Sequence, residues 1–172
     1  MSDMDNLVNG VFPDGYRCRD YGYNPYYRPD LWGCERVADI ELSTPDWSYD
    51  TLSVLRRDDG YYIGTDSGCS CPTPFEWYHS MGDYTGPLTR EQCVEECIGL
   101  WSGSAVSDYL TNGRPYAKQD MLDLIESLVG DDEGLANAMR DRVADVERRC
   151  VEEAERSRRE LNDDEDDSSV DE

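Results

Sequence analysis

The sequence predicts an α+β protein in which a small antiparallel sheet of three or more strands carries one packed helix, followed by a C-terminal helical hairpin and an acidic tail. Three patterns support this prediction. Residues 37–43 alternate apolar and polar side chains, residues 51–65 hold two apolar runs on either side of a turn, and residues 88–161 repeat apolar side chains at helical spacing. A chain of 172 residues is long enough for one domain with an appendage.

Composition divides the chain into four segments. These are a Tyr/Pro-rich N-terminal arm at 1–36, an α+β core with a Cys-x-Cys turn at 37–103, a helical hairpin at 104–161 and a disordered acidic tail at 162–172. Tyr, Pro and Gly in the arm interrupt every helical or strand period, so we expect an irregular segment whose rings pack on the body. The alternative is a disordered recognition segment.

The strand and hairpin predictions come from residues 37–65. Strict alternation in 37–43 places Ala38, Ile40 and Leu42 on one face of a half-buried strand. Two further runs, 51–56 and 61–65, flank an Asp-Asp-Gly sequence at 58–60. Asp-Gly suits the positive φ angles of a type I′ turn, so we expect a hairpin here, with the Cys-x-Cys turn leaving its last strand.

The helix predictions begin with a capping box, in which Thr89 caps the helix and Gln92 completes the box. An apolar stripe follows at Val94, Cys97, Ile98 and Trp101, and the Gly and Ser residues at 102–104 are expected to end this helix. A second helix is expected over 117–129, with Gly130 at its C′ position. The long charged helix at about 135–161 has a narrow apolar stripe, which fits a helical hairpin or a coiled-coil seam. The helix just upstream favours the hairpin. The stripe consists of Leu135, Met139, Val143, Val146, Cys150 and Ala154.

Charge and hydropathy limit the possible partners and the compartment. Acidic residues number 39 against 16 basic residues, for a net charge of −23. Such a chain repels nucleic acid and anionic membranes, so we expect no direct nucleic-acid or membrane binding. The charge fits high solubility or a partner with a basic surface. Without a signal-peptide pattern or a membrane-length apolar run, we expect a cytoplasmic protein whose seven cysteines are reduced thiols or metal ligands.

Zinc is the one cofactor that the cysteines suggest. Cys93 and Cys97 lie four residues apart on the predicted helix, and Cys69 and Cys71 in the turn would complete a tetrahedral site with four sulfur ligands. The Cys-x-Cys spacing is tighter than usual zinc motifs, and a Cys in an apolar stripe is typical of a core residue. Inert thiols are therefore the competing interpretation, with no cofactor bound.

Catalysis has little support in the sequence. A strained disulfide between Cys69 and Cys71 would be redox-active, but the nearby acids Asp66 and Glu76 would raise the thiol pKa values. His79 is the only histidine, and no nucleophile elbow, phosphate loop or dinucleotide fingerprint is present. We therefore expect a protein that is not an enzyme.

DNA mimicry is a further alternative for so acidic a chain, because rows of carboxylates can copy the charge of a phosphate backbone. In the 135–161 helix, however, acids are mixed with arginines, which indicates a salt-bridged solvated face.

One stretch resembles a known family. The sequence Asp-Ser-Gly-Cys-Ser-Cys-Pro-Thr-Pro-Phe-Glu at 66–76, with looser matches at 29–35, 48–51 and 58–62, is similar to an uncharacterised family of small proteins from tailed phages, many of actinobacterial hosts. The resemblance covers about residues 21–101 and implies a phage accessory protein without a defined activity. We therefore expect a non-enzymatic module that binds a host or phage protein in the host cytoplasm. The C-terminal helices and the motif would contact the partner, and the motif residues are Asp66, Ser67, Gly68, Cys69, Cys71, Pro72, Pro74, Phe75 and Glu76.

Overall fold

The fold combines one antiparallel sheet with three helices. The computed structural model describes residues 22–45, 47–69 and 73–167, with side chains described to residue 160. The sheet has the order β1-β2-β3-β4, with β1 at Glu35–Glu41, β2 at Ser48–Arg57, β3 at Gly60–Cys69 and β4 at Thr85–Leu88. The helices are α2 (Arg90–Asn112), α3 (Lys118–Val129) and α4 (Glu133–Asp167), with short 3-10 turns η1 (Pro29–Trp32) and η2 (Met81–Asp83). The predicted α+β fold is confirmed.

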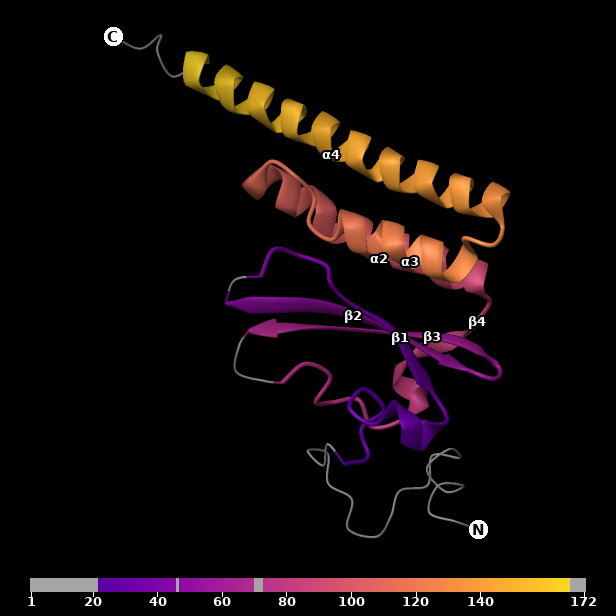
Figure 1. The fold of residues 1–172 in the computed structure, drawn as a ribbon. Helices are drawn as coiled ribbons and strands as arrows, with labels where there is room; N and C mark the ends of the chain where they lie inside the picture. The colour runs from indigo at the N-terminus through magenta and orange to yellow at the C-terminus, as the bar shows by residue number, and fades with distance from the viewer. Residues whose placement is uncertain (1–21, 46, 70–72, 168–172) are drawn as a thin grey trace.

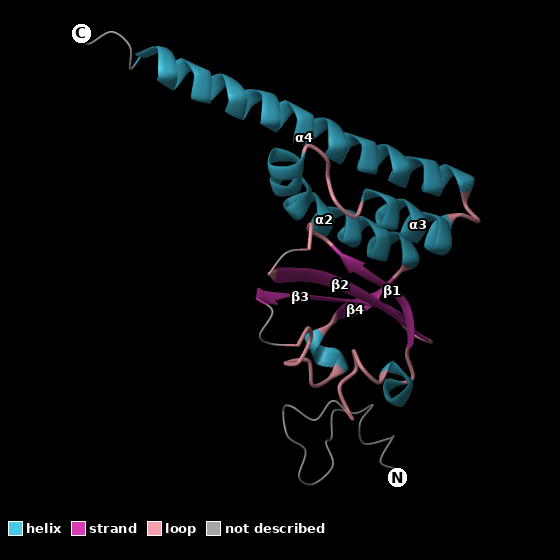
Figure 2. Ribbon diagram, turned by 60° about the vertical axis from the view of Figure 1, so that its left-hand side comes forward, coloured by secondary structure: helices cyan, strands magenta, loops and turns pink. Residues whose placement is uncertain are grey.

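The elements are stacked in layers (Figure 1). Helices α2 and α3 lie side by side over one face of the sheet, and α4 lies across the outer side of these two helices. The irregular segments that carry η1 and η2 lie on the opposite face of the sheet (Figure 2). The sheet is thus covered on both faces, which explains why Leu52, Val54 and Leu55 are all completely buried along β2.

Two separate cores result from this layering. The larger core joins the helix side of the sheet to all three helices, through residues such as Ile40, Leu52, Ile63, Trp101 and Val143. The smaller core lies on the opposite face and contains Trp32, Cys34, Leu55, Tyr62, Met81 and Tyr84. The expectation that the arm packs its aromatic rings on the body is confirmed for residues 22–34; residues 1–21 lie outside the described residues.

The β2–β3 hairpin is confirmed, but the predicted type I′ turn is wrong. Arg57 pairs with Gly60, and the intervening Asp58 and Asp59 do not have positive φ angles. The Asp59 carboxylate instead bonds the Arg57 Nε at 2.8 Å and accepts the Tyr62 hydroxyl at 2.7 Å, which holds this loop in another conformation. Among residues 57–60 of this turn, Gly60 alone has a positive φ, at 145°, and a Cβ there would lie 2.7 Å from the Leu88 carbonyl oxygen. Glycine is required where β3 approaches β4.

Helix α2 begins as predicted and ends later than predicted. The Thr89–Gln92 capping box is present, and the stripe from Val94 to Trp101 is buried. The helix continues through Gly103 to Asn112 and ends at Gly113, which has a φ of 74°. Interior glycines cost about 1 kcal/mol each relative to alanine. The buried stripe nevertheless continues from Trp101 to Ala105, so tertiary packing carries the helix past Gly103. The expected end at 102–104 is therefore wrong.

Helices α3 and α4 form the predicted hairpin, although two details differ. The expected disordered tail from residue 162 is wrong for 162–167, because α4 continues to Asp167; residues 168–172 lie outside the described residues. Gly130 follows α3 with a φ of −61°, so it is not the left-handed C′ glycine that the sequence predicted. A Cβ at Gly130 would lie 2.4 Å from the Glu126 carbonyl oxygen, so close packing selects glycine there.

None of the described helices has an apolar stretch long enough to cross a bilayer.

Candidate protein-binding surface

The motif at 66–76 is anchored to the sheet through Asp66 and Phe75. Asp66 lies in β3, and its Oδ2 accepts the Phe75 backbone N–H at 2.5 Å and the Tyr49 hydroxyl at 3.2 Å. Phe75 is completely buried and has a φ of 60°, a left-handed conformation that costs a non-glycine residue roughly 1–2 kcal/mol. The surrounding contacts must therefore hold this residue in place.

Residues of the N-terminal arm supply those contacts. The Tyr26 ring stacks on Phe75 with centroids 4.2 Å apart, and the Tyr78 ring meets Phe75 edge-on at 4.8 Å. The buried Asn24 side chain donates to the Phe75 carbonyl at 2.7 Å, and the Tyr27 hydroxyl donates to the Pro74 carbonyl at 2.7 Å. The arm and the motif therefore hold each other against the face of the sheet opposite the helices.

The predicted motif residues fall into two groups. Phe75 and Glu76 are buried and Asp66 is half-buried, so these three act within the fold. Ser67 and Cys69 are exposed at the end of β3. Gly68 packs under the Tyr49 ring, where a Cβ would lie 2.9 Å from the Tyr49 hydroxyl. Cys71 and Pro72 lie outside the described residues.

The candidate zinc ligands are only partly brought together. Cys93 and Cys97 are both buried in the larger core, and a hydrogen bond with Cys93, together with burial, raises the pKa of the Cys97 thiol. Cys69 is exposed at the end of β3. Within the described residues, no three His, Cys, Asp or Glu side chains are grouped as a metal site requires, and Cys71 lies outside that set. Two sulfurs alone do not fit a structural zinc site, which takes four ligands. The zinc site stays a prediction.

An exposed tryptophan marks the end of the sheet where β2 begins and β3 ends. We call this the distal end and define it by Trp47, Ser48, Ser67 and Cys69. The Trp47 side chain is 86 % exposed, and the next residue, Ser48, pairs directly with Cys69. Trp47 is not among the site residues predicted from the sequence, although an aromatic residue in the break between two strands, after Pro45-Asp46, was the available signal.

A polar cavity of about 350 Å³ lies beside the distal end, between the β1–β2 loop and the last turns of α2. Asp108 lies in its wall at 7 % exposure, and its Oδ1 accepts the Thr44 N–H at 3.0 Å. Its Oδ2 has no hydrogen-bond partner among the described residues. The Asn112 side chain donates to the Thr44 hydroxyl at 3.1 Å, so two contacts fix the loop before Trp47 to α2.

Comparison with known proteins adds one match. The model of a family described as "Domain of unknown function (DUF7574)" matches residues 23–130. The chain belongs to this family. No curated protein and no solved structure matches the chain. The match runs from the ordered arm through the sheet, α2 and α3, so it reaches beyond residue 101, where the sequence resemblance was expected to end.

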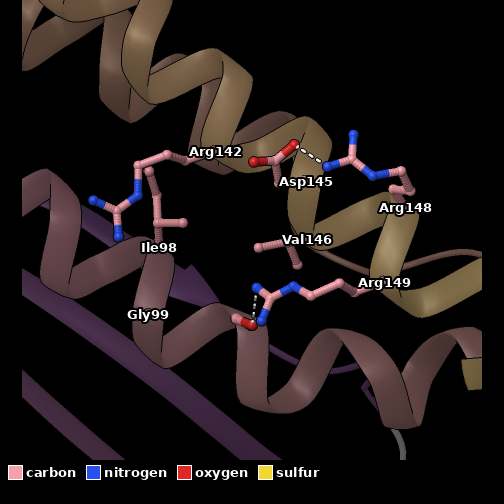
Figure 3. A pocket seen from close by; sticks show the side chains of 8 residues that line it. Ile98, Gly99, Arg142, Asp145, Val146, Arg148 and Arg149 are labelled. Atoms are coloured by element: carbon pink, nitrogen blue, oxygen red, sulfur yellow. Dashed lines mark hydrogen bonds and ion pairs between the residues drawn. The ribbon is translucent and has the colours of Figure 1, made fainter. Parts of the chain in front are cut away.

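Helix α4 lies outside the DUF7574 match and packs against α2 of that domain. A groove of about 440 Å³ lies between the two helices. Figure 3 shows Arg142 and Arg149 reaching from α4 toward α2 on either side of Val146, and Asp145 pairing with Arg148. Arg142 pairs with Glu95, and Arg149 donates to the Ser102 hydroxyl at 3.1 Å. Because each guanidinium has an acceptor within the chain, packing of α4 on the DUF7574 domain explains this groove.

Proposed function

We propose that the chain is a non-enzymatic, phage-encoded protein-binding module that acts on a host or phage protein in the host cytoplasm. The distal end is its contact surface. The observation that supports this proposal is the 86 % exposure of Trp47 beside the exposed Ser67 and Cys69. It places a large apolar side chain next to the exposed part of the motif on which the family resemblance rests.

Trp47 has the properties of a binding anchor. Tryptophan is enriched among interface residues whose truncation costs about 2 kcal/mol or more, because the ring buries a large apolar area and loses little side-chain entropy. The Thr44 N–H donates to Asp108, and the Asn112 side chain donates to the Thr44 hydroxyl, so the loop before Trp47 is held against α2. A loop fixed in this way presents its anchor with little further ordering on binding.

The charge of the chain favours a partner with a basic surface. A net charge of −23 steers such a partner toward the module and repels nucleic acid. Two arginines of α4 pair with acids one turn away, Arg148 with Asp145 and Arg156 with Glu153. This mixed face supports protein binding over DNA mimicry.

The proposal is tested by affinity capture from infected host cells with Trp47→Ser. The matched control is Leu110→Ser, which removes another exposed apolar side chain, at 50 % exposure, from α2. We expect the wild-type chain and the control to capture one dominant protein that Trp47→Ser loses, with an affinity reduced by about 30-fold or more in a purified assay. Equal capture by all three chains would exclude the distal end, and the absence of any captured protein would contradict the binding function.

A structural zinc module stays the second candidate, supported by the adjacent thiols of Cys93 and Cys97 in the larger core. It requires two further ligands, and Cys71 is the predicted ligand that the structure does not describe.

A further inference from the structure

Strand β1 has a free outer edge in the described part of the chain. Its only strand partner there is β2, with Ile40 opposite Leu52, and the Leu42 N–H donates to the Asp50 carbonyl at 2.6 Å. In an antiparallel pair, alternate residues direct their backbone groups toward the neighbouring strand. The backbone N–H and C=O groups of Asp39 and Glu41 therefore point away from β2, and the described residues supply no backbone partner for them.

A groove of about 250 Å³ runs between this strand and α3. Ala38, Ile40 and Leu124 provide apolar walls. On α3, the exposed side chains of Asp120 and Asp123 line the same groove. Asp123 accepts a hydrogen bond from Gln119 at 2.8 Å, and within the described residues neither aspartate forms an ion pair with Lys or Arg.

We propose that this groove binds an extended segment of a partner protein in which Lys or Arg alternates with apolar residues. The segment adds a strand beside β1, and its backbone bonds the outward groups of Asp39 and Glu41. Addition of a strand to a sheet edge is a recurring mode of peptide recognition, in which backbone hydrogen bonds supply affinity and alternate side chains supply specificity. The inference rests on the proposed protein-binding function but uses a surface other than the distal end.

The spacing of the acids fits such a strand. Side chains three residues apart on a helix have Cβ atoms roughly 5–6 Å apart. Side chains on one face of a strand repeat about every 6.6–6.8 Å. Two basic residues, separated by one apolar residue, therefore reach Asp120 and Asp123 together when their side chains face α3.

Charge makes a second copy of this chain an unsuitable occupant. Edge-to-edge pairing of two β1 strands would bring Asp39 and Glu41 of one copy close to the same acids of the other, and inward or edge charges oppose such pairing. The bulge between Arg36 and Ala38 also ends the regular edge, so the pairing segment is short. A basic partner segment avoids this repulsion, and its basic side chains face Asp120 and Asp123 on α3.

The binding test uses the full chain and a fluorescein-labelled peptide, Gly-Lys-Val-Arg-Val-Lys-Val-Arg-Gly, measured by fluorescence anisotropy. One control peptide carries N-methyl groups on alternate amides, which removes strand hydrogen bonds and keeps the charge. The other replaces every Lys and Arg with Glu. We expect N-methylation to weaken binding by about tenfold or more and the acidic peptide not to bind. Equal binding of the N-methylated peptide would overturn the strand-addition proposal, as would no binding of the parent peptide.

Two variants at Asp39 isolate the backbone contribution. Asp39→Asn removes the charge and keeps the outward N–H, whereas Asp39→Pro also removes that N–H, and proline is tolerated at outward positions of edge strands. We expect Asp39→Pro to bind the peptide about tenfold more weakly than Asp39→Asn. Equal affinities would contradict the proposal; if circular dichroism shows Asp39→Pro to be unfolded, the N-methylated peptide decides.

The acids on α3 and the distal end are tested separately. The double variant Asp120→Asn/Asp123→Asn should bind the peptide several-fold more weakly and with a smaller salt dependence, because exposed charge pairs contribute up to about 1 kcal/mol each. Unchanged binding would exclude these acids. Trp47→Ser should bind the peptide as the wild type does. Peptide binding without capture of a protein would contradict only the proposed function, and capture that depends on Trp47 without peptide binding would contradict only this inference.

Discussion

Replacing Phe75 tests whether the motif is held by packing against a strained backbone. Phe75 is completely buried between Tyr26 and Tyr78. Truncation of a buried Phe to Ala costs about 3–5 kcal/mol, and the ring pairing with Tyr26 adds about 0.5–1.5 kcal/mol. We therefore expect Phe75→Ala to lower the free energy of unfolding by at least about 3 kcal/mol. Urea titration followed by far-ultraviolet circular dichroism and linear extrapolation measures this change.

The comparison with glycine at the same position isolates the backbone strain. At ordinary positions Gly is less stable than Ala by about 0.5–1 kcal/mol, but a φ of 60° costs alanine about 1–2 kcal/mol that glycine does not lose. Phe75→Gly should therefore be more stable than Phe75→Ala by up to about 1.5 kcal/mol. The control is Leu55, which is equally buried on the same face of the sheet and lacks a positive φ. At that position, Leu55→Gly should be less stable than Leu55→Ala. The reasoning is refuted if Phe75→Ala costs under about 1.5 kcal/mol, or if glycine is the worse substitution at both positions.

Three further predictions concern stability. Ala117 has a φ of 56°, so Ala117→Gly should stabilise the protein by a few tenths of a kcal/mol to about 1 kcal/mol. Ala105→Gly inside α2 should instead destabilise it by about 1 kcal/mol in the same urea assay. A loss of stability at both positions would contradict the strain argument. Burial raises the pKa of the Cys34 thiol to about 11, above the unfolded value of about 8.5, so its contribution to stability is complete below about pH 8.5 and is lost as the pH rises toward 11. Cys34→Ala should therefore show a shallower alkaline loss of stability than the wild type between about pH 8.5 and 10, and parallel curves would exclude this thiol as a cause. Excess chelator should leave the unfolding midpoint unchanged if Cys93 and Cys97 are core thiols, and a marked fall would establish a structural metal.

The sequence predicted those elements whose local pattern agrees with their environment. The β2–β3 hairpin, the Thr89 cap and the stripe of α2 were all predicted, because period and punctuation are local signals. Strand β4 was missed because its Thr-Gly-Pro-Leu sequence has no strand period, and only its pairing with β3 makes it a strand. The continuation of α2 past Gly103 depends on burial by α4 and the sheet, which no local pattern records.

The candidate surface was predicted only in part. The sequence singled out the motif, but the burial of Phe75 within it depends on the arm residues Asn24 and Tyr26, which lie some fifty residues upstream. Contacts between residues so far apart in the sequence produce no pattern within the motif from which they could be predicted. Trp47 was missed for another reason: its position in the break between two strands indicates a loop, but it does not show whether the side chain is exposed.

The position of α4 has a consequence for the DUF7574 domain of this chain. The family match ends at Gly130, whereas α4 begins at Glu133 and packs on both α2 and α3. Its buried residues, Met139, Val143 and Val146 among them, belong to the same core as the sheet and the other helices. A polypeptide limited to 23–130 would therefore expose an apolar surface that α4 covers here. In thermodynamic terms, α4 behaves as a tethered ligand of the domain, and a form of this chain that ended at Gly130 would need another helix, a second copy or a partner to cover the same surface.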